Sequence, residues 1–168
     1  KPVIKGIENV QDESTLFIGN HISGFDILIL AYALKKRGLR FMAKKEFFDT
    51  KWKWFFEKCG AFPIDREKVD LEAVKTAVRL LKEKNDVVIF PEGTRSKTGE
   101  LLEFKKGFSS IAKLGGVKIT PFAITGKFKF RAHPTIEFGE AIDLKTLDID
   151  KKEYDSYVEE KVKMLIKK

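Results

Sequence analysis

The sequence predicts a single-domain α/β fold, with a mainly parallel, mixed central sheet flanked by helices. Three observations lead to this prediction. Short apolar runs typical of strands alternate with longer segments of helical periodicity, charged and hydroxyl residues directly follow several of those runs, and 168 residues suit one domain with a sizeable core.

The first half of the chain shows this alternation clearly. The short apolar run 15–19 is typical of a buried strand, and the longer apolar run 27–34 is typical of a buried helix. The run 87–90 is rich in β-branched residues, as strands are. Before it, 70–84 has a helical apolar stripe made of Leu71, Val74, Val78 and Leu81. The elements expected here are strand 15–19, helix 24–37, strand 40–43, helix 44–59, strand 61–64, helix 70–84 and strand 86–90.

The second half continues in the same way. Helix 106–114 is expected from the periodic apolar residues Phe108, Ile111, Ala112 and Leu114. A charged helix 150–166 is expected from an apolar side made of Tyr154, Tyr157, Val158, Val162 and Leu165. Between them lie a strand at 118–124 and two short strand-like pieces at 127–131 and 135–138. This hairpin-like stretch makes the expected sheet mixed.

The segment 44–58 alternates lysines with phenylalanines and tryptophans. One side of a helix here would carry Phe48, Trp52, Phe55 and Cys59. We expect that side to belong to the core, with Cys59 as a buried, small apolar residue. Phe47 and Trp54 fall away from it among lysines, and such aromatic residues suit the headgroup region of a bilayer. We therefore predict that Phe47 and Trp54 contact a membrane surface.

Composition narrows the function classes. The net charge of +8 and the pI of about 9.4 favour anionic partners, either nucleic acid or an anionic membrane surface. No nucleic-acid motif is visible and the lysines are scattered, so the membrane surface is the better interpretation. A single cysteine excludes a disulfide framework within the chain, two histidines without a Cys/His cluster argue against zinc, and no apolar run reaches the length of a transmembrane helix.

His21 and Asp26 lie five residues apart, between the strand 15–19 and the helix that follows. Residues five apart on one helix point about 140° apart, so these two can meet only if His21 precedes the helix and Asp26 lies in its first turn. Ser23 and Gly24 permit such a turn. A carboxylate that accepts from one imidazole nitrogen leaves the other free to take a proton. The pair is therefore a candidate general base with its orienting partner; a packed histidine beside an ordinary first-turn acid is the alternative.

Charged and hydroxyl residues also follow the strand 86–90. Arg95, Lys105 and Lys106 are candidate phosphate ligands, arginine through its bidentate fork and lysine as a point charge. Arg66 follows another strand-like run, which favours anion recognition at that edge as well. A charged surface turn is the alternative at each place.

Four blocks of sequence together resemble one known family. They are NHISGFD (20–26), GAFPIDR (60–66), FPEGTRS (90–96) and ITPF (119–122), in that order. The chain resembles the glycerolipid acyltransferases, and most closely the 1-acyl-sn-glycerol-3-phosphate (lysophosphatidate) acyltransferases. The resemblance extends from about residue 6 to about residue 139, and it implies a glycerol-3-phosphate acyltransferase-like fold.

The resemblance also implies an activity. A fatty acyl group would pass from acyl-CoA or acyl-carrier protein, as co-substrate, to the sn-2 hydroxyl of lysophosphatidate, with no other cofactor and no metal. His21 would take the hydroxyl proton and Asp26 would orient it, so that the acceptor attacks the thioester directly and Cys59 is not needed as a nucleophile. By the family pattern the acceptor is bound by Glu92, Gly93, Thr94, Arg95 and Arg66. We add Lys105 on grounds of charge, and expect N–H groups of residues 24–26 as oxyanion donors.

Two other hypotheses stay open. One is the same chemistry on glycerol-3-phosphate or on another lysophospholipid, and the more distant one is an inactive membrane-binding module with the same fold. Relatives carry apolar helices ahead of the first block, whereas this chain starts at Lys1 without an initiator methionine, so an N-terminal membrane element is expected to be missing from it. The expected partners are a lysophospholipid, an anionic membrane surface and, as one donor, acyl-carrier protein. The expected location is the cytoplasmic face of a membrane.

Overall fold

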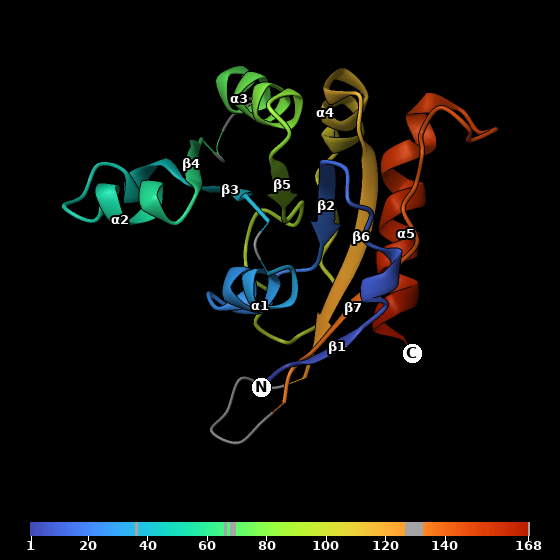
Figure 1. Ribbon diagram of the computed structural model, residues 1–168, viewed down its shortest axis with the longest axis horizontal. Coiled ribbons are helices and arrows are strands. Elements are labelled where there is room, and N and C mark those ends of the chain that lie inside the picture. The colour runs from blue at the N-terminus through green and yellow to red at the C-terminus, as the bar shows by residue number, and fades with distance from the viewer. Residues whose placement is uncertain (36, 66, 68–69, 127–132, 168) are drawn as a thin grey trace.

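Strand β2 (Thr15–Gly19) runs through the centre of the protein, and all of its residues are buried. The computed structural model describes residues 1–35, 37–65, 67, 70–126 and 133–167. Within these residues seven strands form one sheet in the order β1-β7-β6-β2-β5-β3-β4 (Figure 1). The other strands are β1 (Val3–Lys5), β3 (Leu39–Lys44), β4 (Ala61–Ile64), β5 (Asp86–Ile89), β6 (Lys118–Thr125) and β7 (Thr135–Phe138).

The sheet is mainly parallel, as the sequence predicts. β2 pairs in parallel with both β5 and β6, and β3 pairs in parallel with β4 and β5. The one antiparallel pairing among the described strands joins β6 to β7, which makes the sheet mixed. Because β2 and β5 are parallel neighbours, the residues that follow Gly19 and Ile89 emerge at the same edge of the sheet.

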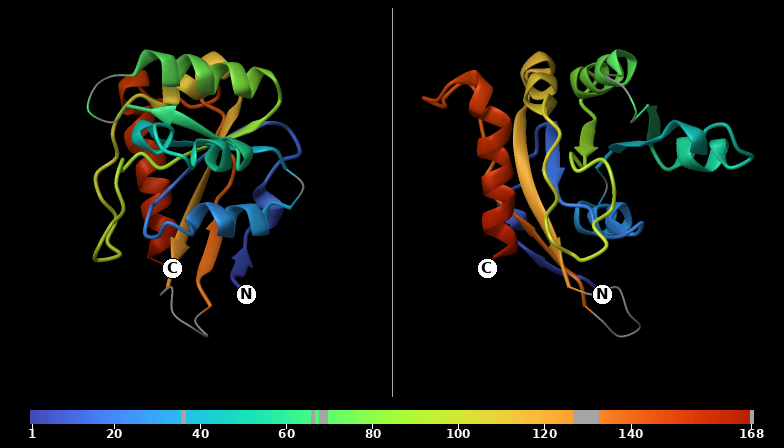
Figure 2. Two further views of the ribbon diagram at one scale, coloured as in Figure 1. Left: turned by 90° about the vertical axis from the view of Figure 1, so that its left-hand side faces the viewer. Right: turned by 180° about the vertical axis from the view of Figure 1, so that it is seen from behind.

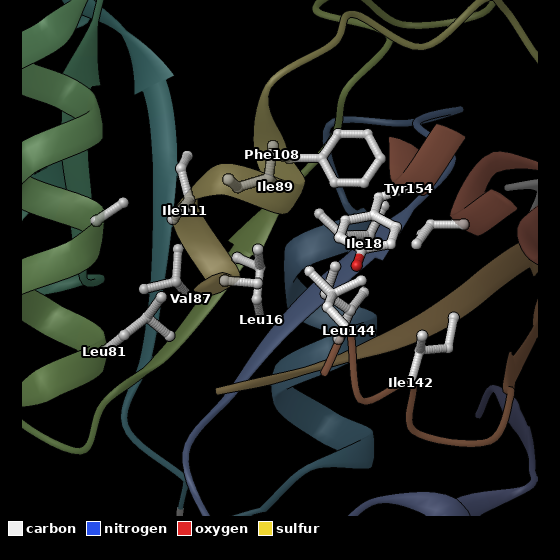
Figure 3. Packing of buried hydrophobic residues seen from close by; sticks show 14 of the residues in the cluster. Leu16, Ile18, Leu81, Val87, Ile89, Phe108, Ile111, Ile142, Leu144 and Tyr154 are labelled. Carbon is white, nitrogen blue, oxygen red and sulfur yellow. The ribbon is translucent and has the colours of Figure 1, made fainter. Parts of the chain in front are cut away.

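Helices cover both faces of the sheet (Figures 1 and 2). They are α1 (Asp26–Ala33), α2 (Lys53–Lys58), α3 (Leu71–Lys82), α4 (Phe108–Gly115) and α5 (Tyr154–Ile166), with 3-10 turns η1 (Ile7–Asn9), η2 (Lys45–Phe47) and η3 (Lys151–Glu153). The strand period of two sends Leu16 and Ile18 to the face covered by α3, α4 and α5, and Phe17 to the face covered by α1. Figure 3 shows the first of these layers, in which Leu81, Phe108, Ile111 and Tyr154 from the helices pack near Leu16, Ile18, Val87 and Ile89.

The helices begin later than the sequence suggests, and for α4 the local reason is clear. Gly107 has a left-handed backbone with φ 110°, so α4 starts at Phe108 rather than at residue 106. Asp155 of α5 caps that start by accepting from the N–H groups of Gly107 and Ser109 at 2.6 and 2.9 Å. The predicted helix 24–37 is shorter still, since α1 ends at Ala33.

Arg37 accounts for part of this shortening, because its side chain binds groups at the amino end of the sheet and its backbone lies outside the helix. Its guanidinium pairs with Asp86 at the start of β5 and donates to the backbone carbonyls of Gln11 and Glu13 at 2.6 and 2.8 Å. The hydrogen bond to Asp86 holds the pKa of Arg37 above its ordinary value. Asp86 is buried and also accepts from the N–H of Thr15 at 3.1 Å. The cluster therefore joins the starts of β2 and β5.

The prediction of one helix over 44–59, with a core-facing side, is wrong. The chain forms the short turn η2, then a turn, then the six-residue helix α2, which stands away from the sheet (Figure 1). Thr50 interrupts the helix because its hydroxyl donates to the carbonyl of Phe47 and accepts from the N–H of Trp52. Trp52, Phe55 and Cys59 are consequently exposed rather than buried.

Two smaller differences concern α3 and the hairpin. Leu71 is exposed, because α3 buries the side that carries Ala73, Ala77, Leu80 and Leu81, while Val74 and Val78 pack at its margin. The strand-like piece expected at 127–131 lies outside the described residues. The strand expected at 135–138 is present as β7.

Candidate active site

The end of β2 is fixed in place by Asn20, the first residue of the first block. Its side-chain amide donates to the carbonyl of Ile124 at 2.8 Å and accepts from the N–H of the same residue at 2.7 Å. Asn20 is buried, so this pair of hydrogen bonds forms away from water. The pair fixes the end of β2 against β6 and so sets the position of the next residue, His21.

His21 and Asp26 are in contact, in the arrangement that their spacing predicts. His21 lies in the turn before α1 and Asp26 is the first residue of that helix. Nδ1 of His21 lies 2.7 Å from Oδ2 of Asp26. The same oxygen accepts from the N–H groups of Ile22 and Ser23 at 2.8 and 2.9 Å. One carboxylate oxygen thus holds both the imidazole and the turn that carries it.

The other carboxylate oxygen of Asp26 has a different environment. Asp26 is fully buried, and no described residue donates a hydrogen bond to its Oδ1. Burying a carboxylate oxygen without a hydrogen-bond donor is unfavourable, and such sites are more common in functional centres than in structural ones. The two oxygens of Asp26 therefore differ: Oδ2 accepts from the imidazole and the turn, and Oδ1 faces the protein interior.

The segment after β5 holds the backbone of His21 on both sides. Oε1 of Glu92 accepts from the N–H of His21 at 2.6 Å, and the N–H of Ser96 donates to the carbonyl of His21 at 2.8 Å. The ring of Phe90 stacks on the imidazole, with centroids 4.3 Å apart and planes 21° apart. The block FPEGTRS therefore positions His21 through backbone contacts and ring stacking.

Glu92, which the resemblance implies as an acceptor ligand, is held by protein backbone groups on both of its oxygens. It is only 5% exposed, and its second oxygen, Oε2, accepts from the N–H of Leu102 at 3.0 Å. Burial raises the pKa of Glu92 above its ordinary value, and the hydrogen bonds from His21 and Leu102 act in the opposite direction. Each of its oxygens accepts one protein N–H, and the side chain is absent from the lining of the cavity beside His21.

Two cationic side chains lie close to the turns around His21. Gly93 has φ 68°, and a Cβ added there would lie only 3.2 Å from Nζ of Lys105. A Cβ added at Gly24 would lie 3.4 Å from Nη1 of Arg95. The glycines thus let Lys105 and Arg95 approach the backbone closely, and both cations are exposed to solvent at the same edge.

A cavity of about 590 Å³ opens beside His21. Among the predicted site residues it is lined by His21, Gly93, Lys105 and Lys106. Thr94 and Arg95 are exposed nearby, Asp26 and Glu92 are buried in the protein, and Arg66 lies outside the described residues. One part of the cavity wall is apolar and comprises Met42, Ile64, Val74, Ile89, Phe108 and Ile111.

The N–H groups expected to act as oxyanion donors are largely engaged already. The N–H of Phe25 donates to the hydroxyl of Ser23, and that of Asp26 donates to the carbonyl of Ser23, each at 3.2 Å. In the described part of the chain, no group of three or more His, Cys, Asp or Glu side chains could hold a metal ion. None of the described helices is long and apolar enough to cross a bilayer.

Comparison with known proteins decides the family. A family model described as Acyltransferase matches residues 1–125, which include all four blocks. The chain belongs to the Acyltransferase family. This acyltransferase-family chain is 34% identical over 141 residues to a 1-acyl-sn-glycerol-3-phosphate acyltransferase of Streptococcus pneumoniae (80% of this chain, 52% of the relative). It is 39% identical over 121 residues to the protein of the same name from Bacillus subtilis (71% and 60%).

A solved structure extends the similarity to almost the whole acyltransferase domain. The crystal structure of the 1-acyl-sn-glycerophosphate (LPA) acyltransferase PlsC from Thermotoga maritima superposes with a TM-score of 0.78 at 28% identity. The match covers 99% of this chain and 71% of that one. The chain spans between half and two thirds of the length of the two bacterial relatives.

Several members of this acyltransferase site were not identified from the sequence alone. Three of them, Asn20, Phe90 and Ser96, lie within the recognised blocks, but the amino-acid sequence does not show which groups they contact. Pairing of β2 with β5 would have indicated these contacts, because it places the residue after Ile89 beside the residues after Gly19. Leu102 carries no such signal, since its contribution to Glu92 is a backbone N–H.

Proposed function

We propose that this domain transfers a fatty acyl group from a thioester donor to the sn-2 hydroxyl of lysophosphatidate and so forms phosphatidate. The observation that supports this most is the 2.7 Å contact between His21 and Asp26 at the wall of a cavity with cations beside it. The names of its relatives agree with this activity. Donor, acceptor and mechanism are inferred from the chemistry of the site.

His21 is the proposed general base. Asp26 accepts from Nδ1, so that nitrogen carries the proton and Nε2 has a lone pair for the acceptor hydroxyl. As the proton moves to Nε2, the hydroxyl oxygen attacks the thioester carbonyl. The carbon–sulfur bond then breaks, and the leaving thiolate takes the proton back from the imidazolium. No acyl-enzyme is needed, and the exposed Cys59 lies outside the cavity lining.

Glu92 is a positioning residue in this proposal. Its carboxylate holds the backbone N–H of His21 and that of Leu102, and it does not reach the cavity lining. Displacing a catalytic group by about 1 Å can lower a rate about a hundredfold. A fixed backbone at His21 therefore matters as much as the orientation of its ring.

The acceptor phosphate is proposed to bind Arg95 and Lys105. Both are exposed beside the turns around His21, and Gly93 lets Lys105 approach the backbone. Thr94 adds a hydroxyl at the same edge, and Arg66 remains an expectation from the family pattern. The apolar wall made by Met42, Val74 and Phe108, among others, suits an acyl chain.

The donor is proposed to be acyl-CoA or acyl-carrier protein. Both are acidic, and the chain carries a net charge of +8, so either suits the electrostatics. No cofactor beyond this co-substrate is needed for the chemistry. The domain is proposed to act at a membrane surface, where lysophosphatidate is found.

The test is acyl transfer from labelled acyl-CoA and from acyl-carrier protein in detergent micelles. Lysophosphatidate, lysophosphatidylcholine and glycerol-3-phosphate are offered in competition as acceptors. Lysophosphatidate should react at least ten times faster than lysophosphatidylcholine, because choline esterification blocks the phosphate that Arg95 and Lys105 bind. Arg95→Gln should raise the KM for lysophosphatidate about tenfold or more. The matched control is Arg79→Gln, on the exposed face of α3, which should leave the KM unchanged.

Two results would replace the proposal with one of its alternatives. Equal or faster transfer to glycerol-3-phosphate or to lysophosphatidylcholine would assign a different acceptor. No transfer to any acceptor, by a folded protein that still binds vesicles, would make this chain a membrane-binding module that has kept the fold.

A further inference from the structure

Residues 44–58 form an aromatic protrusion that connects β3 to β4 and extends from one side of the molecule (Figure 1). Four large side chains in it are exposed: Phe47 (46%), Trp52 (53%), Trp54 (61%) and Phe55 (47%). We propose that the aromatic protrusion docks this domain on an anionic lipid bilayer, with Trp52 and Trp54 as its main anchors.

Internal packing of the protrusion accounts for only part of its aromatic content. Phe56 is half-buried and forms the centre of the protrusion. Its ring stacks on that of Phe47, with centroids 4.9 Å apart, and contacts the rings of Phe48 and Phe55 at centroid distances of 6.2 and 5.8 Å. This small cluster keeps the protrusion folded. Trp54 contacts this cluster through Phe55, with ring centroids 6.1 Å apart. Both tryptophans remain more than half exposed, although exposed apolar area of this kind is unfavourable in water.

The charges around these aromatic residues favour a lipid surface as the docking partner of the protrusion. The protrusion contains five lysines against three acidic residues, in a chain of net charge +8. Lys51 lies over the ring of Trp52, with Nζ 5.8 Å from the centroid. Tryptophans interleaved with lysines match the headgroup region of a bilayer, where indole rings reach the acyl boundary and ammonium groups meet lipid phosphates. The choice of a lipid rests also on the proposed function, whose acceptor is a membrane lipid.

The position of the protrusion relative to the cavity supports the same conclusion. β3 and β4, which the protrusion connects, supply Met42 and Ile64 to the cavity wall. Helix α1 begins at Asp26 and lies on the same side of the molecule as α2 (Figure 2, left). Its Leu28 and Tyr32 are exposed large apolar side chains. A bilayer that meets the protrusion would therefore also meet α1, which starts at the catalytic turn.

Tryptophan fluorescence tests the proposal directly, because Trp52 and Trp54 are the two tryptophans of the whole chain. Adding vesicles of phosphatidylcholine and phosphatidylglycerol should shift the emission to shorter wavelength, and brominated acyl chains should quench it. Trp52→Phe and Trp54→Phe separate the two contributions. An unchanged emission spectrum at saturating vesicle concentration would overturn the proposal.

Sedimentation with the same vesicles measures the affinity. Trp52→Ser combined with Trp54→Ser should lower the partition coefficient about tenfold or more. The matched control combines Leu114→Ser with Met164→Ser, two exposed apolar residues on α4 and α5, and should bind like the wild type. Lys51→Gln combined with Lys58→Gln should weaken binding to anionic vesicles only, and added salt should remove that difference.

The remaining outcomes separate docking from catalysis and from protein contacts. Transfer to a short-chain, water-soluble lysophosphatidate without vesicles should be the same for the wild type and the double Trp variant. A blue shift in a protein without transfer activity would support docking while the proposed function fails. Equal vesicle binding by the double Trp variant, together with loss of a dimer on gel filtration, would make the protrusion a contact between copies and overturn the proposal.

Discussion

The two ends of β2 and β5 carry buried aspartates in contrasting environments. At the amino end, both oxygens of Asp86 accept hydrogen bonds, from the guanidinium of Arg37 and from the N–H of Thr15. At the carboxyl end, Asp26 uses one oxygen for His21 and the turn, and its other oxygen has no donor among the described residues. The fully satisfied cluster joins two strands of the sheet, whereas the incompletely satisfied one holds the proposed general base.

The partners of each aspartate explain the difference. Arg37 is always charged and is held by backbone carbonyls as well as by Asp86, so the amino-end pair has no proton to exchange near neutral pH. His21 can gain and lose a proton, and it is only partly covered by Phe90 at the cavity wall. In the proposed mechanism, two buried aspartates at opposite ends of the same strands thus serve stability and reactivity separately.

Replacing Asp26 should have the largest effect. Asp26→Asn presents an amide where one oxygen now accepts from His21, Ile22 and Ser23, so the imidazole loses its fixed tautomer. By comparison with other His–Asp pairs, kcat should fall about 10³- to 10⁴-fold. Steady-state acyl transfer measures the loss, and ¹⁵N NMR of the imidazole reports the tautomer. A rate within tenfold of the wild type would mean that Asp26 does not orient the base.

Replacing Asp86 should lower the stability of the protein and leave its activity almost unchanged. Asp86→Asn leaves the half-buried guanidinium of Arg37 without its counter-ion. Breaking a fully buried pair costs roughly 3–5 kcal/mol, and solvent contact of Arg37 should reduce the loss here to roughly 2–3 kcal/mol. Urea unfolding should show that loss, while kcat measured well below the unfolding midpoint should stay within about threefold. The control is Glu83→Gln, which breaks an exposed pair with Arg79 and should change the unfolding free energy by less than about 0.5 kcal/mol. A large fall in kcat would contradict the division between the two ends.

Glu92→Gln should have an intermediate effect at the carboxyl end. An amide can accept only one of the two N–H groups that Glu92 holds, so kcat should fall about ten- to a hundredfold with little change in KM. Glu100→Gln, in the exposed loop nearby, is the control. A rise in KM without loss of kcat would instead indicate that Glu92 binds the acceptor.

The pH dependence of stability gives a second test of Glu92. Burial raises its pKa in the folded protein, so the folded state keeps this proton to a higher pH than the unfolded chain does. Stability should therefore fall as pH rises from about 4.3, the ordinary value for glutamate, through the raised pKa. Urea midpoints between pH 4 and pH 8 should show less of this fall in Glu92→Gln. Identical profiles for the two proteins would contradict the raised pKa.

Cys59→Ser should have the smallest effect. The thiol is exposed and lies outside the cavity lining, and direct attack on the thioester needs no protein nucleophile. Activity and the unfolding free energy should both match those of the wild type. A loss of more than tenfold in kcat would point to an acyl-enzyme and exclude the direct mechanism.

The sequence predicted the parts that depend on local pattern. The strand at 15–19, the contact of His21 with Asp26 and the mixed sheet follow from apolar runs, turn chemistry and spacing, because strand ends at one edge bring distant segments together. The family pattern located the block 90–96, but not its backbone contacts with His21, which depend on the pairing of β2 with β5.

The protrusion shows where pattern fails. Helical spacing of Phe48, Trp52 and Phe55 indicated a core-facing side, yet the hydroxyl of Thr50 breaks the helix and the segment projects from the sheet. Apolar periodicity tells which residues avoid water but not what covers them. The same limit explains Leu71, which fits the stripe of α3 but lies at its exposed first turn.

The most direct test of the account compares His21→Ala with the wild type in acyl transfer to lysophosphatidate and in urea unfolding of the same samples. The account predicts that kcat falls about 10²- to 10⁴-fold while the unfolding free energy changes by less than about 1 kcal/mol, because His21 supplies chemistry rather than stability. His133→Ala, at an exposed histidine outside the cavity lining, should leave both unchanged. Retained activity in a well-folded His21→Ala protein would contradict the central claim that His21 is the base.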